Sequence, residues 1–317
     1  MAAIIRVRPY SGGDETSLLH VWNETMWGDR IDAATWRSRV LLDPNFVPEC
    51  CAVAEGSQGI PIGFMLGLAR QVPYFAQGYE REKSWITAFG VLPEHRHAGV
   101  GSALLEHVCQ ALQAGGAQEV AVAPYVPNYF IPGVDVAIYA DAVRFLERHA
   151  FGVQSRPLSM RADIATFQVP EEIAAARVRL QAESIQVGLA TAEDIVPIRQ
   201  FLRRCFSWDW LRFAGEVMQD LFAGNPWTAG MLVAKQDAAV IGYAQFRAER
   251  FGPFGVDPAL RSRGIGRVLL AQTLIEMRKH GYHCAWFLWT SDDAARLYQR
   301  CGFREVRRFA VMRKSLV

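Results

Sequence analysis

The hydrophobic pattern of the chain describes the same series of elements twice. Short apolar segments of strand length alternate with longer segments whose apolar residues recur at helical spacing. In each half we expect a strand, two helices, three strands, a helix, a strand, a helix and a final strand region. This order predicts an α/β fold in which each half forms a mixed β-sheet flanked by helices.

An internal repeat supports this division. The segment FGVLPEHRHAGVGSALL at Phe89–Leu105 recurs as FGVDPALRSRGIGRVLL at Phe254–Leu270, with nine identical residues at a constant offset of 165. Repetition at a fixed period indicates a repeated structural unit. We therefore predict a first domain at residues 1–165, a linker with a short helix at residues 166–184, and a second domain at residues 185–317.

Each copy of the repeat places a glycine-containing loop between a strand and a helix. The first N–H groups of a helix have no intrahelical partner, and the helix dipole makes this end positive. Such ends bind anions, and glycines let a phosphate approach the backbone closely. The sequence therefore predicts two sites for an anionic group.

At these loops the chain resembles the GNAT acetyltransferase superfamily, whose pyrophosphate loop reads R/Q-x-x-G-x-G/A. The resemblance implies two tandem GNAT-like domains that use acetyl-CoA. It also implies direct transfer of the acetyl group, in a ternary complex, to a primary amine of a small molecule or to a peptide N-terminus. The cofactor-binding residues it implies are Val91, Arg96, His97, Ala98, Gly99, Val100, Gly101 and Ser102 in the first copy, and Val256, Arg261, Ser262, Arg263, Gly264, Ile265, Gly266 and Arg267 in the second.

The resemblance also distinguishes the two halves. Tyr298, followed by Cys-Gly-Phe, matches the family's L-Y-x-x-x-G-F pattern, in which the tyrosine protonates the leaving thiolate; the first half has Leu146 in register. Leucine cannot donate a proton, so we expect the second domain to be catalytic and the first to be degenerate or accessory. Glu249 is the candidate general base, although a solvated charge at a strand end explains it equally well.

Two alternatives remain open. The first domain could be the active one, with water or Tyr139 as the acid. Between its fifth strand and the following helix this domain has 13 extra residues, because the repeat offset falls there from 165 to 152. The aromatic loop at residues 124–135 lies in this insertion and could cover a site. Alternatively, the chain is a non-catalytic sensor that binds acyl-CoA.

Composition narrows the remaining possibilities. A net charge of +2 over 317 residues without a basic run argues against nucleic-acid binding. The six cysteines show no CxxC spacing, which predicts free thiols in a reducing compartment and no metal site. We see no signal-peptide pattern, and no apolar run approaches the ~20 residues that span a bilayer. We therefore expect a cytoplasmic monomer or homodimer.

Overall fold

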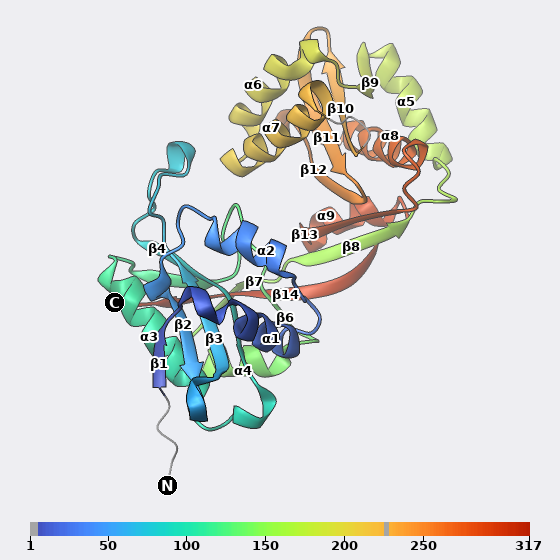
Figure 1. Cartoon of the computed structure of the whole chain (residues 1–317). Coiled ribbons are helices and arrows are strands. Elements are labelled where there is room, and N and C mark those ends of the chain that lie inside the picture. Colours follow the sequence, from blue (N-terminus) through green and yellow to red (C-terminus); the bar gives the residue numbers. More distant parts are fainter. Residues whose placement is uncertain (1–5, 225–227) are drawn as a thin grey trace. The chain divides into compact units, whose positions relative to one another are not determined.

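The computed structural model describes residues 6–224 and 228–317, and the chain divides into two compact units (Figure 1). Unit 1 contains the residues up to Pro157 together with Arg308–Val317, and unit 2 contains Leu158–Arg307. Each unit has a mixed β-sheet flanked by helices, which confirms the predicted fold class.

Unit 1 is built on a sheet in which one neighbouring pair is parallel. Its strands are β1 (Arg6–Pro9), β2 (Cys51–Glu55), β3 (Pro61–Leu68), β4 (Lys83–Val91), β5 (Glu119–Val122), β6 (Val134–Asp135), β7 (Gly152–Ser155) and the end of β14 (Arg304–Ser315). Its helices are α1 (Glu15–Thr25), α2 (Ala33–Trp36), α3 (Val100–Ala114) and α4 (Ala140–Arg148). The strand order is β1-β2-β3-β4-β5-β14, and β4 and β5 form the parallel pair.

Helices cover both faces of the unit 1 sheet. The buried residues of α3 recur every three to four positions, as in an amphipathic helix, and they share one core with Leu146 of α4. On the other face, Trp22 of α1 and Trp36 of α2 pack against Phe64 of β3 in a second core. The sheet therefore lies between two apolar layers.

Unit 2 repeats this arrangement. Its strands are β8 (Leu158–Asp163), β9 (Ile185–Leu189), β10 (Ala229–Gln236), β11 (Ala239–Arg247), β12 (Arg250–Val256) and β13 (Cys284–Thr290). Its helices are α5 (Glu171–Ala182), α6 (Ile195–Cys205), α7 (Trp208–Ala223), α8 (Ile265–Lys279) and α9 (Asp292–Gln299). The strand order is β9-β10-β11-β12-β13-β8, and β12 and β13 are parallel.

Each unit contains a strand from the other half of the sequence. The segment Gly152–Asp163, which holds β7 and β8, corresponds to β14 at an offset of 152 residues. β8 pairs with β13, with Met160 opposite Phe287, whereas the end of β14 pairs with β5, with Met312 opposite Val122. In Figure 1 the red β14 accordingly runs beside β6 and β7. The compact units thus differ at both strands from the ranges 1–165 and 185–317 expected from the sequence.

The expected linker at residues 166–184 is largely helical and belongs to unit 2. Ile173, Ala176 and Leu180 of α5 are buried in the core that also contains Ile265 of α8. The segment that joins the two repeats is therefore a packed element of unit 2.

Candidate functional site

The two glycine loops have the same backbone conformation. His97 and Ser262 have positive φ angles of 60° and 67°, and Gly99 and Gly264 have φ angles of 86° and 94°. Gly99 and Gly264 directly precede α3 and α8 as their N-caps. Glycine adopts this left-handed conformation without steric cost. Each loop therefore presents the unpaired first N–H groups of a long helix, as anion binding requires.

A gap opens between β4 and β5 of unit 1. Their pairing ends with Ile86 opposite Val122, followed by a 2.8 Å hydrogen bond from Ala123 N to the Ile86 carbonyl. β5 ends there, whereas β4 continues to Val91. At the same point β4 contains a β-bulge, because Thr87 has no opposite residue between the pairs Leu66–Ala88 and Gly67–Ile86. Bulges bend a strand and increase its twist.

A cavity of about 960 Å³ occupies this region of unit 1. It is lined by β4 from Thr87 to Val91, by the first glycine loop, by α4 and by the end of α1. Because α1 and α4 pack on opposite faces of the sheet, the cavity connects both faces through the gap. Its volume lies within the usual range for small-molecule and cofactor sites.

Two side-chain hydrogen bonds hold the ends of α4 against the lining. At its start, Tyr139 Oη donates to Asp29 Oδ2 at 2.8 Å. At its end, Ser102 Oγ of the glycine loop lies 3.1 Å from His149 Nε2. Burial lowers the pKa of His149, and the charges of Lys314 and Arg148 lower it further. The imidazole is therefore neutral at pH 7 and can exchange a hydrogen bond with Ser102.

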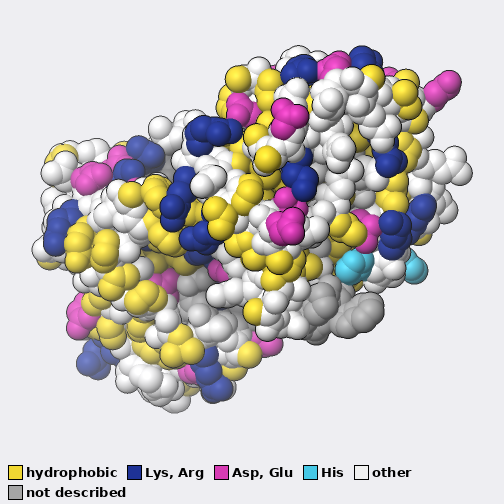
Figure 2. Space-filling model, turned by 90° about the horizontal axis from the view of Figure 1, so that it is seen from above, with side chains coloured by type: hydrophobic (Ala, Val, Ile, Leu, Met, Phe, Trp, Pro, Cys, Tyr) yellow, Lys and Arg dark blue, Asp and Glu magenta, His cyan; other side chains and the backbone are white. Residues whose placement is uncertain are grey.

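Charges are distributed unevenly along this lining. Arg96, His97 and Arg148 of the lining lie in the glycine loop or at the end of α4, Asp141 and Arg144 lie on α4, and Glu24 lies on α1. The cavity thus has cationic groups beside the loop and a carboxylate on α1, while Asp29, which follows α1, contacts the lining residue Tyr139. Over the face shown in Figure 2, by contrast, Lys and Arg side chains are interspersed with Asp and Glu.

Aromatic rings fill the equivalent region of unit 2. The Tyr298 ring lies 4.5 Å from that of Phe287 and 5.9 Å from that of Phe254, measured between centroids. On the other face, Phe206 and Trp210 stack and press on β12, where a Cβ on Gly255 would lie 2.4 Å from Phe206 Cζ. Burial raises the pKa of Tyr298, so its hydroxyl stays protonated.

The second glycine loop borders the end of α5. Arg263 forms an ion pair with Glu183, and Arg179 Nη2 would lie 3.4 Å from a Cβ on Gly264. The other residues predicted for this loop keep the expected order: Val256 ends β12, Arg261 and Ser262 are exposed, and Ile265, Gly266 and Arg267 begin α8.

Glu249 lies in the turn between β11 and β12 rather than within the strand. Its carbonyl accepts a hydrogen bond from Trp286 N at 3.0 Å. From this turn to Val256 is seven residues of strand, or about 23 Å at the usual rise. The role of general base remains a prediction, and this position adds no support for it.

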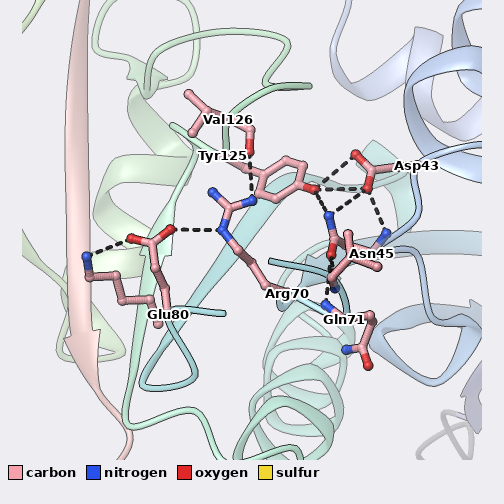
Figure 3. Close-up of polar contacts among 9 residues, drawn as sticks. Asp43, Asn45, Arg70, Gln71, Glu80, Tyr125 and Val126 are labelled. Atoms are coloured by element: carbon pink, nitrogen blue, oxygen red, sulfur yellow. Dashed lines mark hydrogen bonds and ion pairs between the residues drawn. The ribbon is translucent and has the colours of Figure 1, made fainter. Parts of the chain in front are cut away.

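A buried polar network fixes the aromatic loop of unit 1 (Figure 3). Tyr125 is fully buried, and its hydroxyl donates to Asp43 at 2.9 Å and accepts from Asn45 Nδ2 at 2.7 Å. Asn128 Nδ2 donates to the same Asp43 carboxylate at 2.7 Å. The loop is thus anchored in the unit, and its residue Ile131 lines the cavity.

An arginine extends this network to the β3–β4 connection. Arg70 donates from Nε to Glu80 at 2.8 Å and from Nη1 to the Val126 carbonyl at 3.2 Å (Figure 3). Its guanidinium also lies 4.5 Å from the Tyr74 ring centroid and 5.1 Å from that of Trp85. These contacts tie the β3–β4 connection to the aromatic loop and to strand β4.

Several residues in or beside the cavity carry no recognisable signal in the sequence. Asp29 follows a helix, where an acidic residue is common, and Thr87 lies in an apolar strand. The contact between Ser102 and His149 joins residues 47 positions apart. The sequence hints at this contact in one way: the segment with the glycine loop and the segment AVRFLERHAFG, which contain Ser102 and His149, both recur in the second half.

Two further features of the described residues bear on function. None of the helices within residues 6–224 and 228–317 combines the length and apolar character that crossing a membrane requires. In the same ranges, no cluster of three or more His, Cys, Asp or Glu residues could hold a metal ion.

Known structures of similar fold contain the same tandem arrangement. A glucosamine N-acetyltransferase region of a fungal multidomain GH3 β-N-acetylglucosaminidase superposes with a TM-score of 0.79 at 18% identity, over 99% of this chain and 38% of that one. The chain therefore spans well under half of that fungal protein. A GCN5-related N-acetyltransferase from Sphaerobacter thermophilus matches with a TM-score of 0.69 at 17% identity, covering 98% of this chain and 96% of that one.

A third structure is described as tandem in its own name. The tandem GNAT protein from the clavulanic acid biosynthesis pathway matches with a TM-score of 0.62 at 14% identity, over 99% of both chains. No curated protein sequence matches the chain. The family model for the acetyltransferase (GNAT) family, however, matches residues 16–130 and again residues 195–303. With two matches that together cover more than half of its length, the chain belongs to the acetyltransferase (GNAT) family.

Proposed function

We propose that this acetyltransferase uses acetyl-CoA to acetylate a primary amine, and that the reaction takes place in unit 1. The observation that carries the proposal is the cavity, which connects the first glycine loop, the gap beside β4 and Tyr139, whose hydroxyl donates to Asp29. This reverses the assignment favoured by the sequence, in which Tyr298 marks unit 2 as catalytic.

The residues of unit 1 fit an extended, anionic cofactor. The backbone amides of His97–Ser102 would hold its pyrophosphate, with Arg96 and Arg148 as nearby positive charges. Beyond Ile86, the edge of β4 that faces β5 is unpaired and can bind an extended arm as a strand would. Bound acetyl-CoA would supply the activated acetyl thioester.

The carboxylate end of the cavity suits an amine acceptor. Glu24 lines the cavity, and Asp29 contacts the lining residue Tyr139, so both carboxylates would attract an ammonium group. The amine must lose a proton before it can attack. Asp29 shares the Tyr139 proton through a 2.8 Å hydrogen bond. When the Asp29 carboxylate takes up the proton of the amine, the Tyr139 O–H no longer has to donate to it and can donate its one proton to the leaving thiolate.

Unit 2 is the second candidate. Its loop has the same backbone conformation, and the protonated Tyr298 lies beside β12 and β13. A third candidate is an acyl-CoA sensor.

The acceptor is open within the class of primary amines; the name of the fungal structural relative makes an amino sugar one compound to test. The six cysteines are free thiols, which supports a reducing compartment such as the cytoplasm.

Two matched tyrosine substitutions test the location of the chemistry. Thiol release from acetyl-CoA is measured with a panel of amines for the wild type, Tyr139→Phe and Tyr298→Phe. We expect Tyr139→Phe to lower kcat by about 10²-fold, because the pair loses its proton, and Tyr298→Phe to have a much smaller effect. The opposite result assigns catalysis to unit 2. Cofactor binding without amine-stimulated release would favour a sensor.

A further inference from the structure

Thr87 of unit 1 has a buried hydroxyl with an unused hydrogen-bond donor. The residue is 4% exposed, lines the cavity and forms the bulge of β4. Its Oγ1 contacts no hydrogen-bond partner in the part of the chain that the structure describes. An unpaired buried hydroxyl is unfavourable, and most buried polar groups in proteins are paired. A group from outside the chain is therefore the natural partner.

The fold itself does not require this hydroxyl. β12 of unit 2 is irregular at the same place, where only Gln245 lies between the pairs Ala244–Phe254 and Phe246–Phe251. The residue equivalent to Thr87, 165 positions later, is Gly252, which has no side chain. A bulge at this position thus forms with or without a hydroxyl, so the hydroxyl of Thr87 is a feature of unit 1 that the fold does not require.

A second threonine shows why the Thr87 proton is available. Thr25 is also buried and also lines the cavity, but its hydroxyl donates to the Val21 carbonyl at 2.7 Å. Around Thr87 the lining is apolar, formed by Ala88, Val122 and Ala123. The carboxylates of the lining, Glu24 and Asp141, lie instead on α1 and α4. The expected partner of Thr87 is therefore an uncharged acceptor of hydrogen bonds.

We infer that the Thr87 hydroxyl donates a hydrogen bond to the thioester carbonyl oxygen of an acyl-CoA bound in unit 1; the inference rests on the function proposed above. A carbonyl oxygen only accepts hydrogen bonds, and it gains negative charge as an amine attacks its carbon. Thr87 stands where β4 and β5 part, at the closed end of the gap that an extended cofactor arm would enter. The hydroxyl would therefore recognise the acyl group and distinguish acetyl-CoA from free CoA.

The test compares acetyl-CoA and CoA binding by calorimetry in the full chain. Thr87→Val removes the hydroxyl but keeps the shape, and Thr87→Ser restores the hydroxyl. Thr273→Val, in the interior of α8, is the control for loss of a buried hydroxyl, which there donates to the Leu269 carbonyl. All variants are also made with Gly266→Glu, which introduces a negative charge into the second loop, so that binding reports on unit 1.

We expect Thr87→Val to weaken acetyl-CoA binding roughly tenfold, the size of one lost hydrogen bond, with little change in the Kd of CoA. Thr87→Ser should keep the wild-type ratio of the two constants, and Tm should not fall in Thr87→Val, because no internal hydrogen bond is lost. An unchanged ratio, or equal weakening of both ligands, overturns the inference. Retention of acetyl transfer by Gly101→Glu instead overturns the assignment of catalysis to unit 1.

Discussion

Ile86 and Val122 border the gap in unit 1, and the residues 165 positions later are Phe251 and Phe287 of unit 2. The larger rings join Tyr298 in a packed aromatic cluster, with Phe251 6.1 Å from Tyr298 between centroids. At this scale, side-chain volume distinguishes two sites whose backbones are alike. The same contrast appears at the bulge, where unit 1 has Thr87 and the equivalent residue of unit 2, 165 positions later, is Gly252.

His149 provides a test of the lining through pH. Its pKa is lowered by burial, so folding favours the neutral ring. The stability that the neutral form contributes is present above the ordinary pKa of about 6.5 and is lost as pH falls through the lower folded value. The variant His149→Gln does not lose stability in this way, because glutamine takes up no proton in this pH range. We therefore expect the Tm of the variant, relative to the wild type, to rise between pH 7.5 and pH 5.5 in thermal melts.

A difference in Tm that does not depend on pH would contradict the neutral state assigned to His149. His95→Gln is the matched control, because His95 lies in a short 3-10 turn before the loop, outside α4. Its Tm difference should not follow the same trend.

At the level of elements, the aromatic loop at residues 124–135 is the part of the cavity wall that is specific to unit 1, and it leads into helix α4, which has a counterpart in α9. The loop is anchored through Tyr125 and Asn128 to Asp43, and α4 is held at both ends, by Asp29 and by Ser102. The extra length in the first half thus builds a packed wall of the cavity. This explains how a longer connection is accommodated in a compact unit.

Tyr125→Phe tests this anchoring. The substitution leaves Asp43, which is 4% exposed, without one of its donors. We expect a loss of about 1–3 kcal/mol in the free energy of unfolding of unit 1, because a buried acceptor is left partly unsatisfied. Urea denaturation measures it. Tyr79→Phe, on an exposed ring in the β3–β4 connection, should change stability by less than about 0.5 kcal/mol; equal effects would argue against the network.

The sequence allowed the elements to be predicted better than the site. The repeat of Phe89–Leu105 located both glycine loops, because loop glycines and helical periodicity are local signals. Tyr298 was recognised because it lies in a short pattern. The cavity is lined by residues such as Thr87 and Tyr139, which are far apart in sequence and line one cavity only after folding. Whether a gap is open depends on packing volumes, and these have no local signature.

For the whole molecule, the main finding is that each half supplies a strand to the other unit. β8 and the end of β14 share a pattern of consecutive buried residues followed by an exposed arginine, at Arg161 and Arg313. Because the two strands present the same local pattern, this pattern does not indicate which of the two sheets each strand joins. Domain boundaries drawn from the repeat therefore place both strands in the half that encodes them.

Opposite substitutions in the two strands test this exchange. Met312→Asp introduces an unpaired charge beside β5, so unit 1 should lose about 3–5 kcal/mol although the change lies near the C-terminus. Met160→Asp should destabilise unit 2 in the same way. Hydrogen exchange followed in residues 83–122 and in residues 229–256 distinguishes the two. Loss of protection in the half that encodes each strand would contradict the exchange.

The central claim is that acetyl transfer takes place in unit 1, and equivalent substitutions in the two glycine loops test it most directly. Gly101→Glu and Gly266→Glu each place a carboxylate in a loop that would bind phosphate, and a Cβ on Gly101 would already lie 3.2 Å from Phe145. The measurement is the rate of amine-dependent thiol release from acetyl-CoA. We predict that Gly101→Glu lowers this rate at least about 10²-fold and that Gly266→Glu has a far smaller effect. Loss of activity in Gly266→Glu with activity retained in Gly101→Glu would contradict the account.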